Sequence, residues 1–115
     1  MGKVYGLHTV ELKPGVTDEE VEQFARTLIA QMPPISGMRF ALLKGDRGDH
    51  VGRYLWLIEF DSVEARDQLV PESGPTEAML QWYALASPML KGWRQYATTM
   101  PGEETPHTDY HDVTS

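Results

Sequence analysis

The side chains with the most evident chemistry in this sequence are histidines and charged residues inside predicted strands. His8 lies in the first apolar stretch of the chain. Its imidazole can exchange a proton near neutral pH and act as an acid or a base. It could also ligate haem iron. The alternative is a structural role, as a hydrogen-bonded, half-buried strand histidine.

Charged residues inside predicted strands are the next candidates. Arg39, Arg53, Glu11 and Glu59 occupy such positions. A charge on a sheet that is covered on both faces is costly unless it is paired, so we expect one or two of these residues to face a polar cavity. We take Glu59 and Arg39 as catalytic partners of His8. For Arg53 and Glu11 we favour ion pairs at strand ends or at solvent-facing edges.

Several aromatic side chains could line a pocket for an aromatic substrate. Such residues at strand or helix spacing usually belong to a core, which is the role we expect for Trp56. Tyr54, Trp82 and Tyr83 remain candidate substrate-binding residues. Trp82 and Tyr83 lie on the helical segment best placed to cover a pocket.

The glycine-rich stretch KGDRGDHVGRY, residues 44–54, lacks the spacing and the Lys-Ser/Thr pair of a phosphate-binding loop. A strand follows it rather than a helix, and we attribute its Arg-Gly-Asp triplet to chance. The pattern predicts a hairpin loop with glycines at positive-φ positions. A hairpin tip can frame a pocket mouth, so His50 stays a candidate substrate-binding residue.

The chain ends in a stretch with metal-ligand chemistry, PHTDYHD. We expect it to be part of a solvated acidic tail, residues 101–115, without the fixed geometry that a metal site needs. We therefore predict no metal site. Docking of this tail on a dimer partner is our hypothesis for what holds it.

The elements that must position these residues can be placed from periodicity and caps. Thr17-Asp18-Glu19-Glu20 is a capping box that opens a helix with one apolar face, and Pro33-Pro34 ends it. A cap at Asp61-Ser62 opens a short second helix. Thr76 opens a third, which Pro88 is expected to shorten or kink. Strands are predicted at residues 3–12, 35–44, 53–60 and 93–100.

This order of elements predicts an α+β fold, a ferredoxin-like split β-α-β unit with an extra helix, in one domain over residues 1–100. The third strand, RYLWLIEF, is apolar on both faces, although helices can cover only one. The simplest cover for the other face is a second copy related by two-fold symmetry. We therefore expect a homodimer.

Composition excludes several classes of function. The chain of 115 residues has a formal net charge of −7, which disfavours binding to nucleic acid or to anionic membranes. It has no cysteine, so thiolate catalysis and cysteine metal sites are excluded. No apolar run is long enough for a signal peptide or a membrane span. We expect a cytoplasmic protein.

Two segments, HTVELKPGVTDEEVEQF and YLWLIEFDSVEARDQLV, resemble stress-responsive dimeric α+β-barrel (Dabb) proteins. That superfamily includes antibiotic-biosynthesis-monooxygenase-like, EthD-like and polyketide-cyclase-like proteins. The resemblance covers about a third of the chain. It implies a dimeric α+β barrel with a pocket between sheet and helices in each protomer, acting on small, often aromatic molecules, in many members without a cofactor and in others with haem.

The cyclase-like members have one histidine in the first strand and another after the second helix. His8 resembles the first, displaced by two residues, which keeps its side-chain face. No histidine stands in LVPESGPTEAM, where the second would be. The resulting hypothesis is a cofactor-independent acid/base enzyme acting on a hydrophobic or aromatic small molecule, as a monooxygenase, cyclase or isomerase. The alternatives are a haem-binding or haem-handling protein and a non-catalytic ligand-binding or interaction module.

Overall fold

The fold places three helices against a four-stranded antiparallel sheet. It is described here from a computed structural model, in which residues 2–99 and 107–114 are described. The elements follow the order β1 (Val4–Val10), α1 (Asp18–Gln31), β2 (Met38–Lys44), β3 (Tyr54–Phe60), α2 (Val63–Leu69), α3 (Glu77–Lys91), the 3-10 turn η1 (Gly92–Gln95) and β4 (His107–His111). The sheet order is β2-β3-β1-β4, which is that of a ferredoxin-like fold, as predicted.

The helices begin at the expected caps. Thr17 accepts a hydrogen bond from the Glu20 amide at the start of α1, and Ser62 accepts one from the Ala65 amide at the start of α2. Thr76 caps α3 in the same way. Each hydroxyl satisfies an amide that has no partner within its helix. The expected effect of Pro88 is wrong in part, because α3 continues past it to Lys91.

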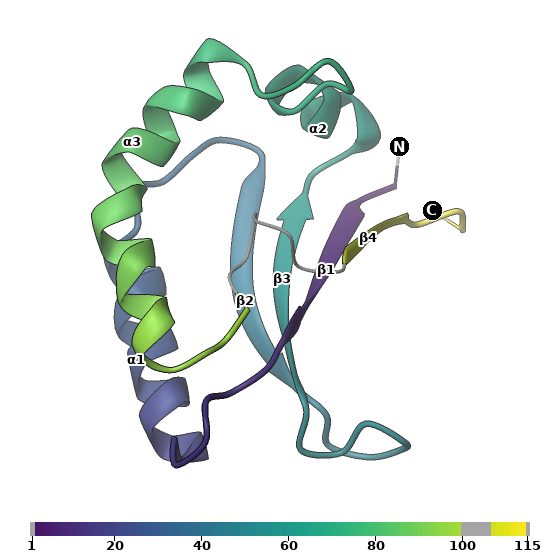
Figure 1. Ribbon diagram of the computed structural model, residues 1–115. Coiled ribbons are helices and arrows are strands. Elements are labelled where there is room, and N and C mark those ends of the chain that lie inside the picture. Colours follow the sequence, from purple (N-terminus) through teal and green to yellow (C-terminus); the bar gives the residue numbers. More distant parts are fainter. Residues whose placement is uncertain (1, 100–106, 115) are drawn as a thin grey trace.

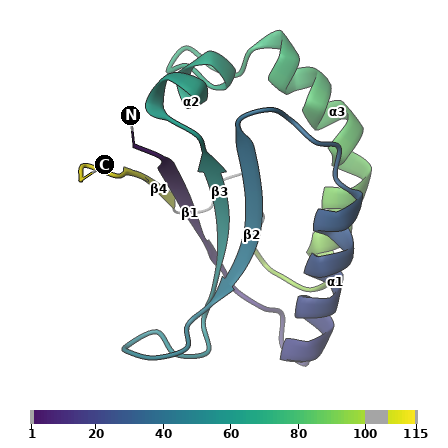
Figure 2. The same ribbon diagram turned by 180° about the vertical axis from the view of Figure 1, so that it is seen from behind.

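Helices α1 and α3 lie side by side over one face of the sheet, and α2 lies beyond the end of β3 (Figures 1 and 2). The helix-facing side chains form the core, including Val21, Trp56, Met79 and Trp93. The predicted core position of Trp56 is therefore confirmed. The opposite face of the sheet is covered by no helix in residues 2–99 or 107–114.

The fourth strand lies at a different place from the one predicted. Residues 92–95 form η1, and Ala97 makes an isolated bridge to Leu12. Trp93, which is 1% exposed, and Tyr96 pack against Phe24 of α1. Burying these rings against a helix stabilises a tight turn rather than an extended strand. Met100 and residues 101–106 lie outside the described part of the chain.

The strand that completes the sheet is β4, in the segment we expected to be a solvated tail. It pairs antiparallel with β1, from Val4 opposite His111 to His8 opposite His107. This pairing satisfies the backbone groups along the outer edge of β1, which a solvated tail would leave exposed. The segment is therefore held by its own chain's sheet.

Residues 44–54 form the hairpin between β2 and β3, as predicted. The Gly45 amide donates to the Arg53 carbonyl at 2.8 Å, and the Gly52 amide donates to the Gly45 carbonyl at 2.8 Å. Gly48 and Gly52 adopt φ angles of 107° and 82°, in the region that favours glycine. The loop projects from the end of the sheet farthest from α2 (Figure 1).

Candidate functional site

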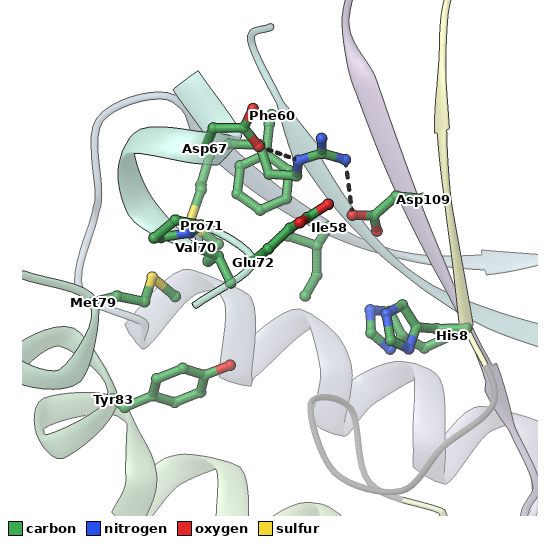
Figure 3. Close-up of a pocket in the computed structure, with 13 residues that line it drawn as sticks. His8, Ile58, Phe60, Asp67, Val70, Pro71, Glu72, Met79, Tyr83 and Asp109 are labelled. Atoms are coloured by element: carbon green, nitrogen blue, oxygen red, sulfur yellow. Dashed lines mark hydrogen bonds and ion pairs between the residues drawn. The ribbon is translucent and has the colours of Figure 1, made fainter. Parts of the chain in front are cut away.

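A cavity of about 760 Å³ lies between the sheet, helices α2 and α3, and the loop that joins them. Figure 3 shows its labelled lining residues. Much of the wall is apolar and consists of Met38, Ile58, Phe60, Val70, Pro71 and Met79. The polar lining residues are His8, Arg66, Asp67, Glu72, Tyr83, His107 and Asp109. A largely apolar pocket with a few convergent polar groups is the usual form of a small-molecule site.

His8 is the buried polar residue of this cavity. Its side chain faces the helices because β1 alternates, and the residue is only 5% exposed. Its Nδ1 atom is buried and has no hydrogen-bond partner among the described residues. The alternative considered for His8, a structural strand histidine, required the ring to be hydrogen-bonded. The buried Nδ1 atom is therefore an exception to the rule that buried polar atoms are hydrogen-bonded.

The surroundings of His8 favour its neutral form. Burial lowers the pKa of His8 below its ordinary value of 6.5, nearby His107 lowers it further, and Asp109 opposes this in part. The His107 ring stacks on it, with centroids 4.7 Å apart. A neutral imidazole at neutral pH can accept a proton.

Tyr83 of α3 provides the second titratable group of the cavity. Burial raises the pKa of its phenol, because the phenolate would lose its hydration. Its hydroxyl therefore stays protonated at neutral pH and can donate a hydrogen bond. In Figure 3 the hydroxyl points into the space in front of His8. His8 and Tyr83 are the predicted site residues that this cavity brings together.

Arg66 of α2 links that helix to β4 at the rim of the cavity. Its Nε donates to Asp67 Oδ1 at 3.1 Å, and its Nη1 donates to Asp109 Oδ2 at 3.2 Å (Figure 3). Gly6 leaves room for this arrangement, since a Cβ there would lie 2.9 Å from Asp109 Oδ1. Arg66 and both of its carboxylate partners therefore belong to the cavity lining.

Glu59 and Arg39 are not brought to His8. Glu59 lies opposite Arg39 of β2 and Tyr5 of β1, whereas His8 lies opposite Trp56. Because side chains alternate along a strand, Glu59 and His8 occupy opposite faces of the sheet. The pairing of His8 with Glu59 or Arg39 in one site is therefore wrong.

Glu59 instead forms an ion-pair cluster on the open face. It accepts hydrogen bonds from Arg39 at 3.1 and 3.2 Å and from Lys3 at 3.4 Å. The hydrogen bonds from Arg39 hold the pKa of the Glu59 carboxyl below its ordinary range, against the opposing effect of burial. Its side chain is nevertheless largely buried, with the residue 7% exposed.

The other candidate substrate-binding residues lie elsewhere. Trp82 is 6% exposed in the core, and its indole nitrogen donates to the Pro33 carbonyl at 2.7 Å. Tyr54 donates to Glu22 of α1, and burial is the main cause that raises its pKa to about 12. Tyr54 and His50 line a separate cavity of about 640 Å³ beside the hairpin. These three residues therefore do not contribute to the His8 cavity.

Five polar residues of the cavity were missed as members of one site: Arg66, Asp67, Glu72, His107 and Asp109. The alternation of β-forming Thr108 and Tyr110 with polar neighbours is a weak strand signal that could have placed His107 and Asp109. Arg66 and Glu72 carry no such signal. In the described residues, no group of three or more His, Asp or Glu side chains is arranged to hold a metal ion.

Comparison with solved structures supports the fold. A dimeric protein of unknown function with a ferredoxin-like fold from Bacteroides fragilis aligns with a TM-score of 0.54 and 16% identity, over 97% of this chain and 98% of that chain. A protein from Pseudomonas aeruginosa aligns with a TM-score of 0.50 and 16% identity, over 98% of this chain and 96% of that chain. A proposed antibiotic biosynthesis monooxygenase from Bordetella bronchiseptica aligns with a TM-score of 0.45 and 14% identity, over 98% of this chain and 99% of that chain. This similarity is too low to support an argument.

The sequence matches no protein-family model and no curated protein. No helix in the described part of the chain has the length and apolar character to cross a membrane. The fold and the cavity thus define a ferredoxin-like α+β protein with a candidate small-molecule site between its sheet and its helices.

Proposed function

We propose that this protein is an enzyme that binds a hydrophobic or aromatic small molecule in the His8 cavity and transfers a proton without a cofactor. The observation that carries the proposal is His8 itself, 5% exposed and with an unpartnered nitrogen, in a cavity with an apolar wall. A general base is most effective when its pKa is close to the working pH. The lowered pKa of His8 keeps it available as a base at neutral pH.

In this proposal His8 takes a proton from a carbon or oxygen atom of the substrate. The negative charge that develops on the substrate is stabilised by a hydrogen bond from the Tyr83 hydroxyl, which burial keeps protonated. The apolar wall holds the ring or chain of the substrate and excludes water. Cofactor-independent isomerisation, cyclisation and oxygenation can each begin with such a proton transfer, so the proposal concerns this shared step.

A substrate-independent assay tests the proposed base. Nitrobenzisoxazole is an apolar probe. When a base removes its ring C–H proton, the N–O bond breaks and a coloured cyanonitrophenolate is released. We expect turnover above buffer, rising with pH through the pKa of His8. Replacing His8 by Ala should lower the rate by about 100-fold.

The matched control is His50→Ala, which removes an exposed histidine outside the cavity. It should retain the full rate. Tyr83→Phe keeps the ring and removes the hydroxyl, so it should slow the probe while the fold is unchanged. Equal rates in the wild-type protein and in His8→Ala would reject His8 as the base.

Haem matches the cavity less well than a hydrophobic or aromatic small molecule does. His8 offers a nitrogen, but haem also carries two anionic propionates. Arg66 is the cavity's permanent cation, and it is already paired with two carboxylates. Titration with haem while following the Soret band would test this alternative. A cavity that binds nitrobenzisoxazole without turnover would instead support the non-catalytic ligand-binding module.

We also propose that two copies associate through the open face of the sheet. Its accessible apolar side chains include Leu7, Leu43, Leu55 and Tyr110. Leu43 is 41% and Tyr110 56% exposed in the single chain. Exposed apolar patches of this kind mark interaction surfaces. The Bacteroides fragilis protein of similar fold is dimeric, which supports the same assembly here.

A further inference from the structure

The ionisable groups around the His8 cavity are unbalanced in charge. Among the described lining residues, and leaving the two histidines aside, there is one cation, Arg66, and there are three carboxylates, Asp67, Glu72 and Asp109. Arg66 contacts Asp67 at 3.1 Å and Asp109 at 3.2 Å, so its charge is already compensated. The described part of the lining therefore presents a net negative charge to a molecule that enters the cavity.

Glu72 is the carboxylate that remains free to act on a ligand. No hydrogen bond or ion pair to it occurs within residues 2–99 and 107–114. It stands in the loop after α2, and it is one of the cavity-lining residues drawn in Figure 3. Glu72 is exposed in the single chain, so an ion pair that it forms with a ligand is partly screened by water.

A second feature points independently to a ligand in the same space. His8 is more than nine-tenths buried, lines the cavity, and has an Nδ1 atom without a hydrogen-bond partner. Buried polar atoms are nearly always partnered in folded proteins, so such an exception calls for an explanation. A bound molecule that contacts this ring would provide one.

We propose that the cavity selects molecules in which an apolar, preferably aromatic body carries a positively charged nitrogen, as in an aralkyl amine. The body would lie against Phe60, Met79 and Ile58, and the ammonium group would pair with Glu72. This inference rests on the proposed function, because it specifies the substrate class for the same cavity. Anionic molecules are disfavoured because no unpaired cation is available to receive them among the described lining residues.

Three probes with one aromatic body and different charges test the selection. Phenethylamine is cationic, phenethyl alcohol is neutral and phenylacetate is anionic at neutral pH. Each would be titrated into the full-length protein while NMR follows the imidazole resonances of His8. We expect phenethylamine to bind about three- to tenfold more tightly than the alcohol, the range for one partly exposed ion pair. Phenylacetate should bind more weakly than the alcohol.

Glu72→Gln should abolish the preference for the amine while binding of the alcohol is unchanged. The matched control, Glu64→Gln, removes an exposed carboxylate of α2 that does not line the cavity, and it should retain the preference. Equal or tighter binding of phenylacetate overturns this inference and leaves the proposed function standing. If no probe perturbs His8, both the inference and the proposed function fail.

Discussion

The imidazole rings of His8 and His107 stack with their centroids 4.7 Å apart and their planes inclined by 12°. The two residues are opposite each other in the β1–β4 pair. One ring is buried and the other is exposed at the sheet edge. Adding a second proton to this pair would place two positive charges in contact, so His107 adds to the effect of burial, which is the larger cause of the lowered pKa of His8.

Replacing His107 by Phe should therefore raise the pKa of His8. Phenylalanine keeps a stacked ring but removes the charge that lowers this pKa. Replacing Asp109 by Asn should shift it in the opposite direction, because Asp109 now raises it. NMR titration of the His8 imidazole measures both changes. An unchanged pKa in His107→Phe would show that burial alone sets the protonation of His8.

The lowered pKa of His8 also makes the stability of the fold depend on pH. The pKa of His8 is lower in the folded state than its ordinary value of 6.5, so the unfolded chain binds more protons just below pH 6.5. The contribution of His8 is present above pH 6.5 and is lost as the pH falls toward the folded-state pKa. Urea unfolding of the wild-type protein and His8→Gln across this range measures it. The variant should lose less stability on acidification.

Glu59→Gln should destabilise the fold and leave proton transfer at His8 intact. The change weakens hydrogen bonds from Arg39 and Lys3. Because Arg39 and Lys3 are exposed, we expect a loss of about 1–2 kcal/mol. The lowered pKa of Glu59 contributes stability that is lost as the pH falls through its folded-state value, so the variant should resist acid relatively better. A large loss of nitrobenzisoxazole turnover in a folded Glu59→Gln protein would restore Glu59 as a catalytic partner.

Local signals were sufficient to predict most of the fold. The helix caps at Thr17, Ser62 and Thr76 each accept a hydrogen bond from an amide three residues ahead. Because this interaction is local, the helix starts could be predicted without knowledge of the tertiary structure. The fourth strand was misplaced because Trp93, Tyr96 and Ala97 recur at helical spacing but stand among β-forming residues. Tertiary packing against Phe24 decided between these two preferences.

The candidate site was predictable only in part. His8 and Tyr83 could be identified because the acid-base chemistry of a histidine or a tyrosine follows from its residue type, whatever the side chain packs against. The pairing of His8 with Glu59 failed although both are buried strand residues. Glu59 lies three positions along β3 from Trp56, the cross-strand neighbour of His8, and an odd offset places its side chain on the opposite face of the sheet. Face assignment across two strands requires the register, which follows from the whole sheet.

Strand β4 should be required for both stability and the pKa of His8. A chain that ends at residue 106 loses the pairing with β1 together with His107 and Asp109. We expect a loss of at least about 1 kcal/mol, which lowers the melting temperature by about 4–8 °C. A matched chain ending at Asp112 keeps β4 and the hydrogen bond from the Asp112 amide to the Lys3 carbonyl. Equal melting temperatures for the two truncations would mean that β4 does not stabilise this sheet.

The open face of the sheet gives the last prediction. Leu43 projects from β2 on the face opposite the helices and is 41% exposed, whereas Leu85 projects from α3 and is 65% exposed. We expect the wild-type protein to be a dimer in sedimentation equilibrium. Leu43→Glu should dissociate it, because two symmetry-related carboxylates would be buried without partners.

Leu85→Glu introduces the same charge on the helical side and should leave the dimer intact. Retention of the dimer in Leu43→Glu, with dissociation in Leu85→Glu, would place the interface on the helices. A wild-type monomer at micromolar concentration would mean that the apolar sheet face is not a self-association surface.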